Sequence, residues 1–295
     1  MSGLVKVFDC QPEVFQGLPC QRLSLACGDS LLIAAQGAQV LSWVSRGRER
    51  LFLSPDNRWD GKTAIRGGVP VCFPQFNQRG SLPRHGFARN MAWQPGVAVA
   101  TSSTTSTTST TDGAQLHFTL TSNAQTLAIW QQNFVVQLQV TLKPGQLSIS
   151  LSVNNTEEQN DLLFSGALHT YLAVDDIALT ELQGLGGRPE WDALTDTHSV
   201  SDEVLYFDGE FDRVYSPPAR PMVLQDGSGQ LQIEQSADWA DTVVWNPGEH
   251  KCADMADMPE HGFARMLCVE AAQVFEPVRI PADGHWTGWQ RFTVY

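Results

Sequence analysis

Several common features are absent from this sequence of 295 residues. Its six cysteines form no Cys-x-x-Cys pair, and their spacing fits neither a zinc site nor a dense disulfide framework. No stretch approaches the ~18 apolar residues of a membrane-spanning helix, and the first residues lack the pattern of a secretory leader. The motifs GxGxxG, GxSxG and HExxH are missing too, which argues against nucleotide-binding, serine-hydrolase and zinc-protease functions. We therefore expect a reduced, soluble protein of the cytoplasm that does not bind a membrane.

Acidic residues are also missing from one long segment, between Asp60 and Asp112. The whole chain has 32 Asp and Glu against 19 Lys and Arg, a net charge of −13. The cations of the segment are Lys62, Arg66, Arg79, Arg84 and Arg89. A positive segment in an acidic protein predicts a site for a small anion, whereas the overall charge opposes general binding to nucleic acid.

Strand patterns dominate what is present. Residues 116–121 and 147–153 alternate apolar and polar side chains, the period of a strand with one buried face. Further strands are predicted at 31–35, 40–44, 127–142 (with an interruption), 162–174, 177–182, 231–234, 242–245, 266–275 and 289–294. No long segment shows a helical period, so we expect an all-β, mostly antiparallel sandwich or barrel with little helix.

The chain shows no change of composition that would mark a linker, and we expect one domain spanning residues 1–295. The run of threonine and serine at 101–111 has no apolar face to bury. It is predicted to be a peripheral loop or hairpin.

Two ionisable residues interrupt strand-like apolar segments. His169 would share a face with Tyr171 and with the small residues Ala167 and Ala173. Glu270 would share one with the small residues Cys268 and Ala272. Small neighbours leave room beside each group, so both are candidates for acid and base catalysis in a pocket. The alternative for His169 is a core histidine that is hydrogen-bonded to a backbone carbonyl. The alternative for Glu270 is an exposed position on an edge strand. The residues alone do not place His169 and Glu270 together.

The arginines of the positive segment suit an anion because the guanidinium binds phosphate with two parallel hydrogen bonds. Gly67 and Gly68 would let the backbone approach a ligand beside Arg66. Each arginine could instead pair with a carboxylate elsewhere. The pentapeptide His-Gly-Phe-Ala-Arg occurs twice, at 85–89 and 261–265, and the residues alone do not say which copy matters.

Six segments match a known family in its order. They are 65–75 (IRGGVPVCFPQ), 82–89 (LPRHGFAR), 168–172 (LHTYL), 243–247 (VVWNP), 255–258 (MADM) and 268–270 (CVE). Together they resemble the hexose-6-phosphate mutarotases, the glucose-6-phosphate 1-epimerases of the aldose 1-epimerase superfamily. The resemblance implies a galactose mutarotase-like β-supersandwich, cytoplasmic, with no metal or cofactor. We also expect a monomer whose partner is a small hexose 6-phosphate.

The resemblance also implies site residues. His169 matches the family's general acid and Glu270 its general base, while His85 matches a histidine that assists at the sugar. Asp212 is similar to the aspartate that holds sugar hydroxyls. The positions near the 6-phosphate correspond to Arg66 and Arg89, with Gln75 beside them. Arg79 and Arg84 match less closely, so the phosphate ligands stay open among the four arginines, and the second pentapeptide is expected to be incidental.

The predicted reaction is the interconversion of α and β anomers of D-glucose 6-phosphate by ring opening. Two rival functions remain at this point. One is an aldose 1-epimerase acting on unphosphorylated hexoses, which would gain little from several arginines. The other is a non-catalytic sugar-phosphate binding protein on the same scaffold, which would not need an acid and base pair.

Overall fold

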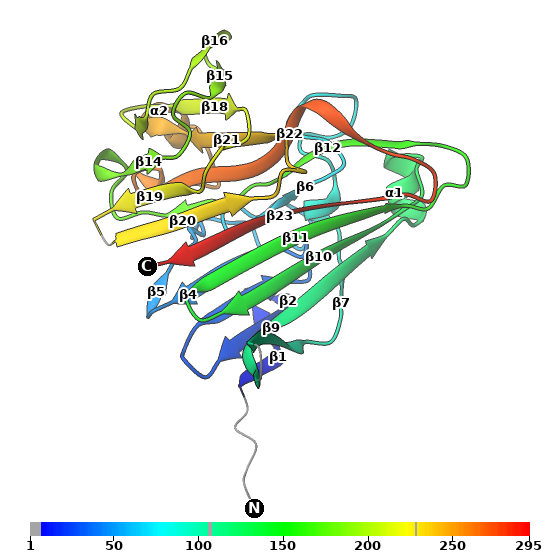
Figure 1. Cartoon of the computed structure of the whole chain (residues 1–295). Coiled ribbons are helices and arrows are strands. Elements are labelled where there is room, and N and C mark those ends of the chain that lie inside the picture. Colours follow the sequence, from blue (N-terminus) through cyan, green and yellow to red (C-terminus); the bar gives the residue numbers. More distant parts are fainter. Residues whose placement is uncertain (1–6, 106–107, 228) are drawn as a thin grey trace, which may run out of the picture.

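The computed structural model describes residues 7–105, 108–227 and 229–295. Its strands form three sheets (Figure 1), and every strand pairing in these ranges is antiparallel. The five-stranded sheet has the order β1-β2-β3-β4-β5, with β1 (Phe8–Phe15), β2 (Leu18–Leu25), β3 (Ser30–Ala34), β4 (Val40–Ser45) and β5 (Arg48–Glu49).

The ten-stranded sheet runs across the front of Figure 1 in the order β17-β14-β19-β20-β23-β11-β10-β9-β7, with β8 paired to β9. Its strands are β7 (Gln94–Pro95), β8 (Val99–Thr105), β9 (Thr108–Thr121), β10 (Phe134–Lys143), β11 (Gln146–Asn155), β14 (Glu181–Gln183), β17 (Val204–Tyr206), β19 (Met222–Asp226), β20 (Gly229–Gln235) and β23 (His285–Val294).

The eight-stranded sheet has the order β16-β15-β18-β21-β22-β12-β6, with β13 paired to β22. Its strands are β6 (Val71–Cys72), β12 (Leu162–Leu168), β13 (Tyr171–Ala173), β15 (Pro189–Asp192), β16 (Thr197–Val200), β18 (Phe211–Tyr215), β21 (Asp241–Asn246) and β22 (Met266–Ile280). This sheet carries the candidate site described below.

Side-chain alternation explains the packing of the two large sheets. On β11 the residues at every second position from Leu147 to Val153 are fully buried, as the sequence pattern predicts. Phe73 after β6 contacts Phe164 on β12 and Phe134 on β10, with ring centroids 5.3 and 5.5 Å away. One hydrophobic core therefore lies between these sheets, and the all-β prediction is confirmed.

Helices are short and few in the described ranges. They are α1 (Ala124–Ile129), α2 (Gly248–Ala253) and the 3₁₀ turns η1 (Ala88–Asn90), η2 (Ile177–Leu179) and η3 (Gly262–Arg265). None of the described helices is long and apolar enough to cross a bilayer.

Three predicted strands were partly wrong. The strand expected at 127–142 starts only at Phe134, because Asn123 caps α1 and accepts hydrogen bonds from the amides of Gln125 and Thr126. The strand expected at 177–182 opens with η2, where Asp176 caps the turn by accepting from the Ala178 amide. The run 162–174 is divided into β12 and β13.

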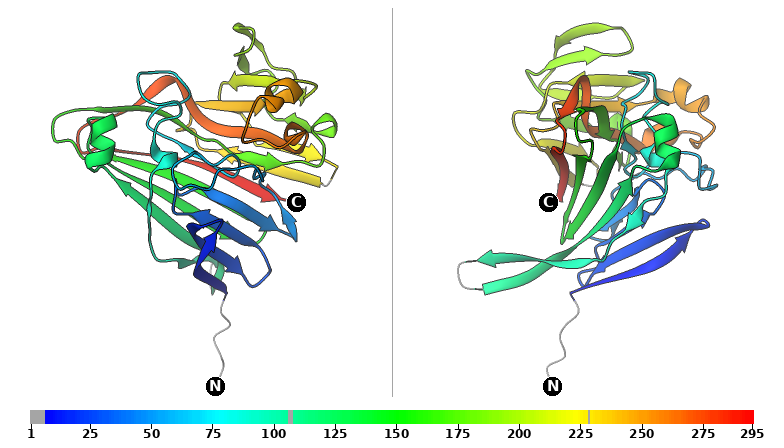
Figure 2. Two further views of the ribbon diagram at one scale, coloured as in Figure 1. Left: turned by 180° about the vertical axis from the view of Figure 1, so that it is seen from behind. Right: turned by 90° about the vertical axis from the view of Figure 1, so that its right-hand side faces the viewer.

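The threonine- and serine-rich run lies at the periphery. Strands β8 and β9 pair from Val99↔Gln115 to Thr105↔Thr108, and this hairpin extends away from the body of the molecule (Figure 2). Residues 106 and 107 lie outside the described residues. On either side of them the run forms the paired strands β8 and β9.

Candidate active site

A cavity of about 250 Å³ opens on one face of the eight-stranded sheet. Alternate residues of three adjacent strands form its floor: Asp212 and Val214 on β18, Val243 and Trp245 on β21, and Glu270 on β22. The opposite face of these strands belongs to the main core. The remaining lining residues are Arg66, Phe76, Asn77, Arg79, Arg84, His85, Arg89, His169, Trp191, Ala193, Lys251 and Met255.

His169 lies at the break between β12 and β13. Its amide donates to the carbonyl of Pro70 at 3.0 Å, outside the regular pairing with β22. The next residue, Thr170, is buried and its hydroxyl donates to the Gln290 side chain at 2.7 Å. The break turns the imidazole into the cavity, where it stacks on Tyr171 with ring centroids 4.8 Å apart.

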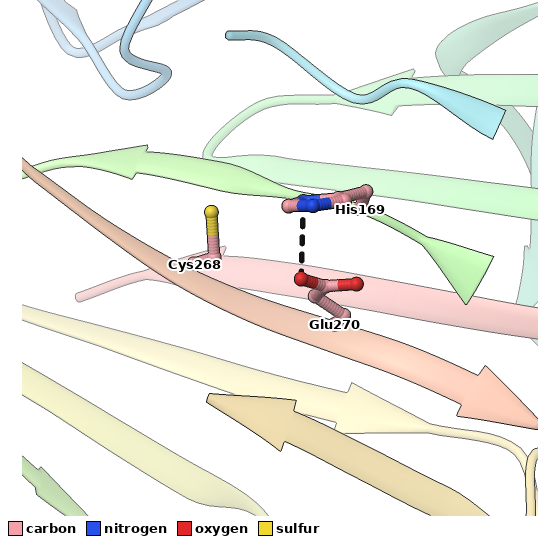
Figure 3. A group of neighbouring side chains, drawn as sticks. All are labelled: His169, Cys268 and Glu270. Carbon is pink, nitrogen blue, oxygen red and sulfur yellow. Dashed lines mark ion pairs between the residues drawn. The ribbon is translucent and has the colours of Figure 1, made fainter. Parts of the chain in front are cut away.

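Glu270 occupies a regular position of β22, opposite Val243 of β21. Its Oε1 lies 3.0 Å from Nδ1 of His169 (Figure 3), and the two side chains are 1 % and 10 % exposed. Nevertheless His169 Nδ1 and Glu270 Oε2 have no hydrogen-bond partner within the described residues. The structure thus brings the two predicted catalytic groups together and leaves polar atoms free for a substrate.

Burial controls the protonation of this pair. It raises the pKa of Glu270 well above its ordinary value, and the nearby Asp212 adds to the increase. Burial also lowers the pKa of His169 well below its ordinary value, with further lowering by His85 and Arg66. Ordinary pKa values predict a carboxylate and, at lower pH, an imidazolium. Burial instead favours the neutral form of each group.

His85 faces the same cavity as an uncharged donor. Burial, then the charges of Arg89 and Arg84, lower its pKa to about 3. Its Nδ1 accepts the Asn77 amide at 3.3 Å and lies 3.2 Å from Cys72 Sγ. Because Nδ1 is the acceptor, the proton of the neutral ring is on Nε2. His85 can therefore donate one hydrogen bond to a neutral oxygen throughout the physiological pH range.

Asp212 lines the cavity with no hydrogen-bond partner for its carboxylate in the described ranges. Burial raises its pKa, which Lys251 partly offsets. Lys251 also contacts Glu210 in an ion pair. This corner can accept hydrogen bonds from hydroxyl groups, which is the role that the resemblance implies for Asp212.

The four arginines differ in what they contact. Arg66 is bound by Asp257, with N–O distances of 3.0 to 3.2 Å, and donates to the Tyr171 hydroxyl at 2.9 Å. Arg79, Arg84 and Arg89 have no carboxylate partner in the part of the chain that the structure describes. Three cations at the cavity thus remain available to an anion, and these include the two that sequence matching ranked lower.

Arg79 and Arg89 are held in place by contacts other than ion pairs. The Arg79 guanidinium lies 4.8 Å from the ring centroid of Trp191 and 5.2 Å from that of Phe275. Arg89 donates to the carbonyl of Arg84 at 3.0 Å, and its buried Nε has no partner in the described residues.

Gln75 does not line the cavity. Its amide donates to the carbonyls of Asn77 and Leu82 and accepts the Leu82 amide, each at 3.0 Å. These bonds close the loop that carries Arg79. The structure therefore gives Gln75 contacts that position the loop, and it shows no free polar group of Gln75 directed at the cavity.

The two pentapeptides fold alike but lie apart. His85 and His261 both have positive φ, at 63° and 60°, and each precedes a 3₁₀ turn. Gly86 packs so closely that a Cβ there would lie 2.1 Å from the Phe73 carbonyl oxygen. His261 is exposed and does not line the cavity, and Arg265 contacts the carbonyl of Asp175. Only the first copy reaches the site.

Sequence reasoning did not assign roles to several residues that shape the cavity. Tyr171 and Trp245 surround the His169 ring, and Asp257 neutralises Arg66. Asp257 and Trp245 each lie in a segment that carried the resemblance, but the sequence did not show which residues they contact. Trp191 and Lys251 carried no such signal.

Comparison with known proteins identifies the family. The model of the family described as aldose 1-epimerase matches residues 20–293. A protein of Escherichia coli named “Putative glucose-6-phosphate 1-epimerase” is 33% identical over 258 residues, which cover 85% of this chain and 82% of that protein. One of the same name from Cenchrus ciliaris is 31% identical over 258 residues, covering 85% of this chain and 77% of its own.

Solved structures agree. The crystal structure of “a putative mutarotase (YeaD)” from Salmonella typhimurium superposes with a TM-score of 0.86 at 27% identity, covering 100% of this chain and 95% of that one. The predicted mutarotase-like fold and the resemblance are thereby confirmed. The chain belongs to the aldose 1-epimerase family.

Proposed function

We propose that this protein interconverts the α and β anomers of D-glucose 6-phosphate and related aldohexose 6-phosphates. One observation carries the proposal: the His169–Glu270 pair shares its cavity with Arg79, Arg84 and Arg89, which have no carboxylate partners in the described residues. The pair suits ring opening at C1. The arginines suit a phosphate at the far end of the same sugar. The names of the E. coli and Cenchrus relatives agree with this substrate.

In the proposed reaction one group removes the C1 hydroxyl proton while another protonates the ring oxygen. A neutral Glu270 and a neutral His169 together contain as many protons as a carboxylate and an imidazolium. Transfer of the Glu270 proton to His169, directly or through the substrate, therefore produces the carboxylate and imidazolium that the reaction uses. Glu270 then takes the C1 proton and His169 gives a proton to the ring oxygen.

The bond between C1 and the ring oxygen opens to the free aldehyde. Rotation about the C1–C2 bond presents the other carbonyl face, and the ring closes with the two roles reversed. His85 donates to a sugar oxygen through Nε2, and Asp212 accepts from hydroxyl groups. Arg84 and Arg89, with Arg79 at the rim, hold the phosphate and so fix the distance to C1.

Arg66 takes a different part in this proposal. It lines the cavity beside His169, but Asp257 and Tyr171 occupy most of its donors. We infer that it fixes the position of His169 and helps to lower the pKa of that histidine. Arg66 also stays a candidate for direct contact with the phosphate. Gln75 positions the loop of Arg79.

Saturation-transfer NMR on glucose 6-phosphate, glucose and galactose tests the proposal. Enhanced anomer exchange mainly for glucose 6-phosphate is the expected result. Equal enhancement for the plain sugars would contradict the phosphate role of the arginines. Binding of glucose 6-phosphate with no exchange would contradict catalysis and favour a binding protein.

A further inference from the structure

Cys268 is a buried thiol beside the catalytic pair that the proposed reaction does not use. It precedes Glu270 by two positions on β22, so both side chains leave the strand on the same face. Figure 3 shows the sulfur next to the His169 ring and the Glu270 carboxylate. The thiol is fully buried and has no hydrogen-bond partner in the described ranges.

These three residues offer ligand atoms of the kinds that zinc takes. His169 Nδ1, Cys268 Sγ and a Glu270 oxygen all lie within 4.8 Å of one another, and the nitrogen and oxygen are 3.0 Å apart. Zinc bonds of roughly 2.0 to 2.3 Å in a tetrahedron separate neighbouring ligand atoms by about 3.5 Å. Side-chain rotations that move these atoms by about 1 Å would satisfy that geometry.

The unmet hydrogen-bonding capacity of these groups also points to a ligand at this place. Glu270 Oε2 is buried and has no hydrogen-bond partner among the described residues, and His169 Nδ1 makes only the ion-pair contact with Glu270 Oε1 at 3.0 Å. Unpartnered buried polar groups are uncommon, since each costs roughly 1–3 kcal/mol. The sugar occupies the cavity side of this group, and a cation coordinated by the three atoms would satisfy the same lone pairs.

We propose that His169, Cys268 and Glu270 form an inhibitory binding site for a thiophilic divalent cation such as Zn²⁺. Three protein ligands would hold the ion, and its fourth position would face the cavity. Binding releases the thiol proton of Cys268 and the carboxyl proton of Glu270 when that is present. The ion engages both groups that move protons in the reaction, so it excludes catalysis and competes with the sugar.

Five of the nearby charges oppose this site and one favours it. The cations Arg66, Arg79, Arg84, Arg89 and Lys251 line the same cavity, whereas the Asp212 carboxylate attracts a metal ion. A hard ion such as Mg²⁺ gains little from a thiol and keeps its water, so it cannot overcome these cations. The site therefore discriminates: Zn²⁺ and Cd²⁺ bind, and Mg²⁺ does not.

The binding experiment needs no enzyme activity. The intact protein is titrated with CdCl₂ while the ultraviolet absorption of a cadmium–thiolate bond is followed, and zinc stoichiometry is measured by calorimetry. We expect one ion per chain in the parent. We expect Cys268→Ala to weaken binding at least about 10- to 100-fold. Cys268→Val repeats the test with the side-chain volume better retained.

Cys252→Ala is the matched control. Cys252 is a buried thiol of the same hydrophobic cluster, does not line the active-site cavity, and should leave binding unchanged. The idea is wrong if the parent shows no thiolate band, or if Cys268→Ala and Cys268→Val bind the ion as tightly as the parent.

Inhibition rests on the proposed function and is measured separately. Zn²⁺ should inhibit anomer exchange competitively with glucose 6-phosphate in the parent and in Cys252→Ala. Cys268→Ala should need at least about tenfold more zinc for the same inhibition. Inhibition that persists in Cys268→Ala, or stoichiometric binding without inhibition, would overturn the inhibitory role. If the parent shows no exchange at all, the proposed function fails while the binding result still decides the metal site.

Discussion

At the scale of single residues, Glu270 is the clearest case of a group that favours chemistry at the expense of stability. A carboxyl group that is 1 % exposed pays a desolvation cost when it ionises. The same burial raises its pKa well above the ordinary value, as is common for groups that transfer protons in active sites. Catalysis and folding therefore make opposite demands on this position.

Glu270→Gln tests both demands. The variant keeps the shape but cannot accept or release the C1 proton, so we expect kcat to fall by about 10²- to 10⁴-fold. Exchange NMR on glucose 6-phosphate measures this loss, and turnover like that of the parent would contradict the role as base.

The same variant should be more stable than the parent at neutral pH. Because the folded pKa of Glu270 lies above 4.5, the folded protein retains a proton that the unfolded chain releases, and the parent loses stability as pH rises above that value. Glutamine has no such dependence. Thermal unfolding should show nearly equal Tm values below about pH 4.5 and a growing advantage of the variant above it. The raised pKa would be contradicted if the Tm of the variant minus that of the parent were smaller at pH 7 than at pH 4.

Arg89 is the residue on which the phosphate assignment is best tested. Removing one charge-assisted contact costs roughly 1.5–3 kcal/mol, which is about 10- to 100-fold in affinity. We expect Arg89→Ala to raise KM for glucose 6-phosphate by that factor and to leave KM for any exchange of plain glucose nearly unchanged. Arg220→Ala is the control, since Arg220 pairs with Glu203 outside the cavity lining. Equal effects on both sugars would refute the assignment.

At the scale of elements, β23 of the ten-stranded sheet supports the catalytic strands of the other sheet. The fully buried Gln290 accepts from the Thr170 hydroxyl at 2.7 Å and donates to the Val269 carbonyl at 3.0 Å. Thr170 follows His169 and Val269 precedes Glu270. One side chain thus ties the neighbours of both catalytic residues together.

Gln290→Met should separate this positioning from simple stability. The substitution removes the acceptor of the Thr170 hydroxyl at 2.7 Å and the side-chain donor to the buried Val269 carbonyl, at roughly 1–3 kcal/mol each. We expect kcat to fall at least about tenfold with little change in KM, because misplaced groups affect the transition state most. Gln36→Met is the control: Gln36 is also buried and donates to the Thr63 carbonyl, far along the chain from the pair. It should lower Tm and leave kcat unchanged, and an equal loss of kcat in both variants would contradict the positioning role.

At the scale of the whole molecule, residues from several sheets and loops of one chain together form the acid and base pair and the arginine cluster. We expect a monomer of 32.5 kDa by light scattering and a specific activity that does not change on dilution. Activity that disappears on dilution together with a larger assembly would show that the site depends on a second chain.

The overall charge and the local charge act on different ligands. The net charge of −13 repels polyanions over a whole surface, whereas the arginines act at short range inside a partly enclosed cavity. We therefore expect a small phosphorylated sugar to bind where a nucleic acid is repelled. The same arrangement gives the chain a substrate preference without a large positive surface.

The sequence by itself determined the elements and the residue types. Alternating side chains at 147–153 required a half-buried strand, and the missing acidic residues between Asp60 and Asp112 indicated an anion site. These are local signals, since periodicity and charge density are properties of neighbouring residues. The matched segments added the family and named His169 and Glu270 as a pair.

Only the tertiary structure decided which groups meet. Thr170 and Gln290 are 120 positions apart, and Arg66 and Asp257 are 191 apart. No local pattern shows that the first pair meets at the break in the strand at 162–174, or that the second neutralises an arginine. The protonation of His169 and Glu270 likewise follows from burial between strands, which favours the neutral form of each group. Long-range contacts and desolvation depend on the packed sheets, and that is why the sequence named the candidates while the fold decided their partners.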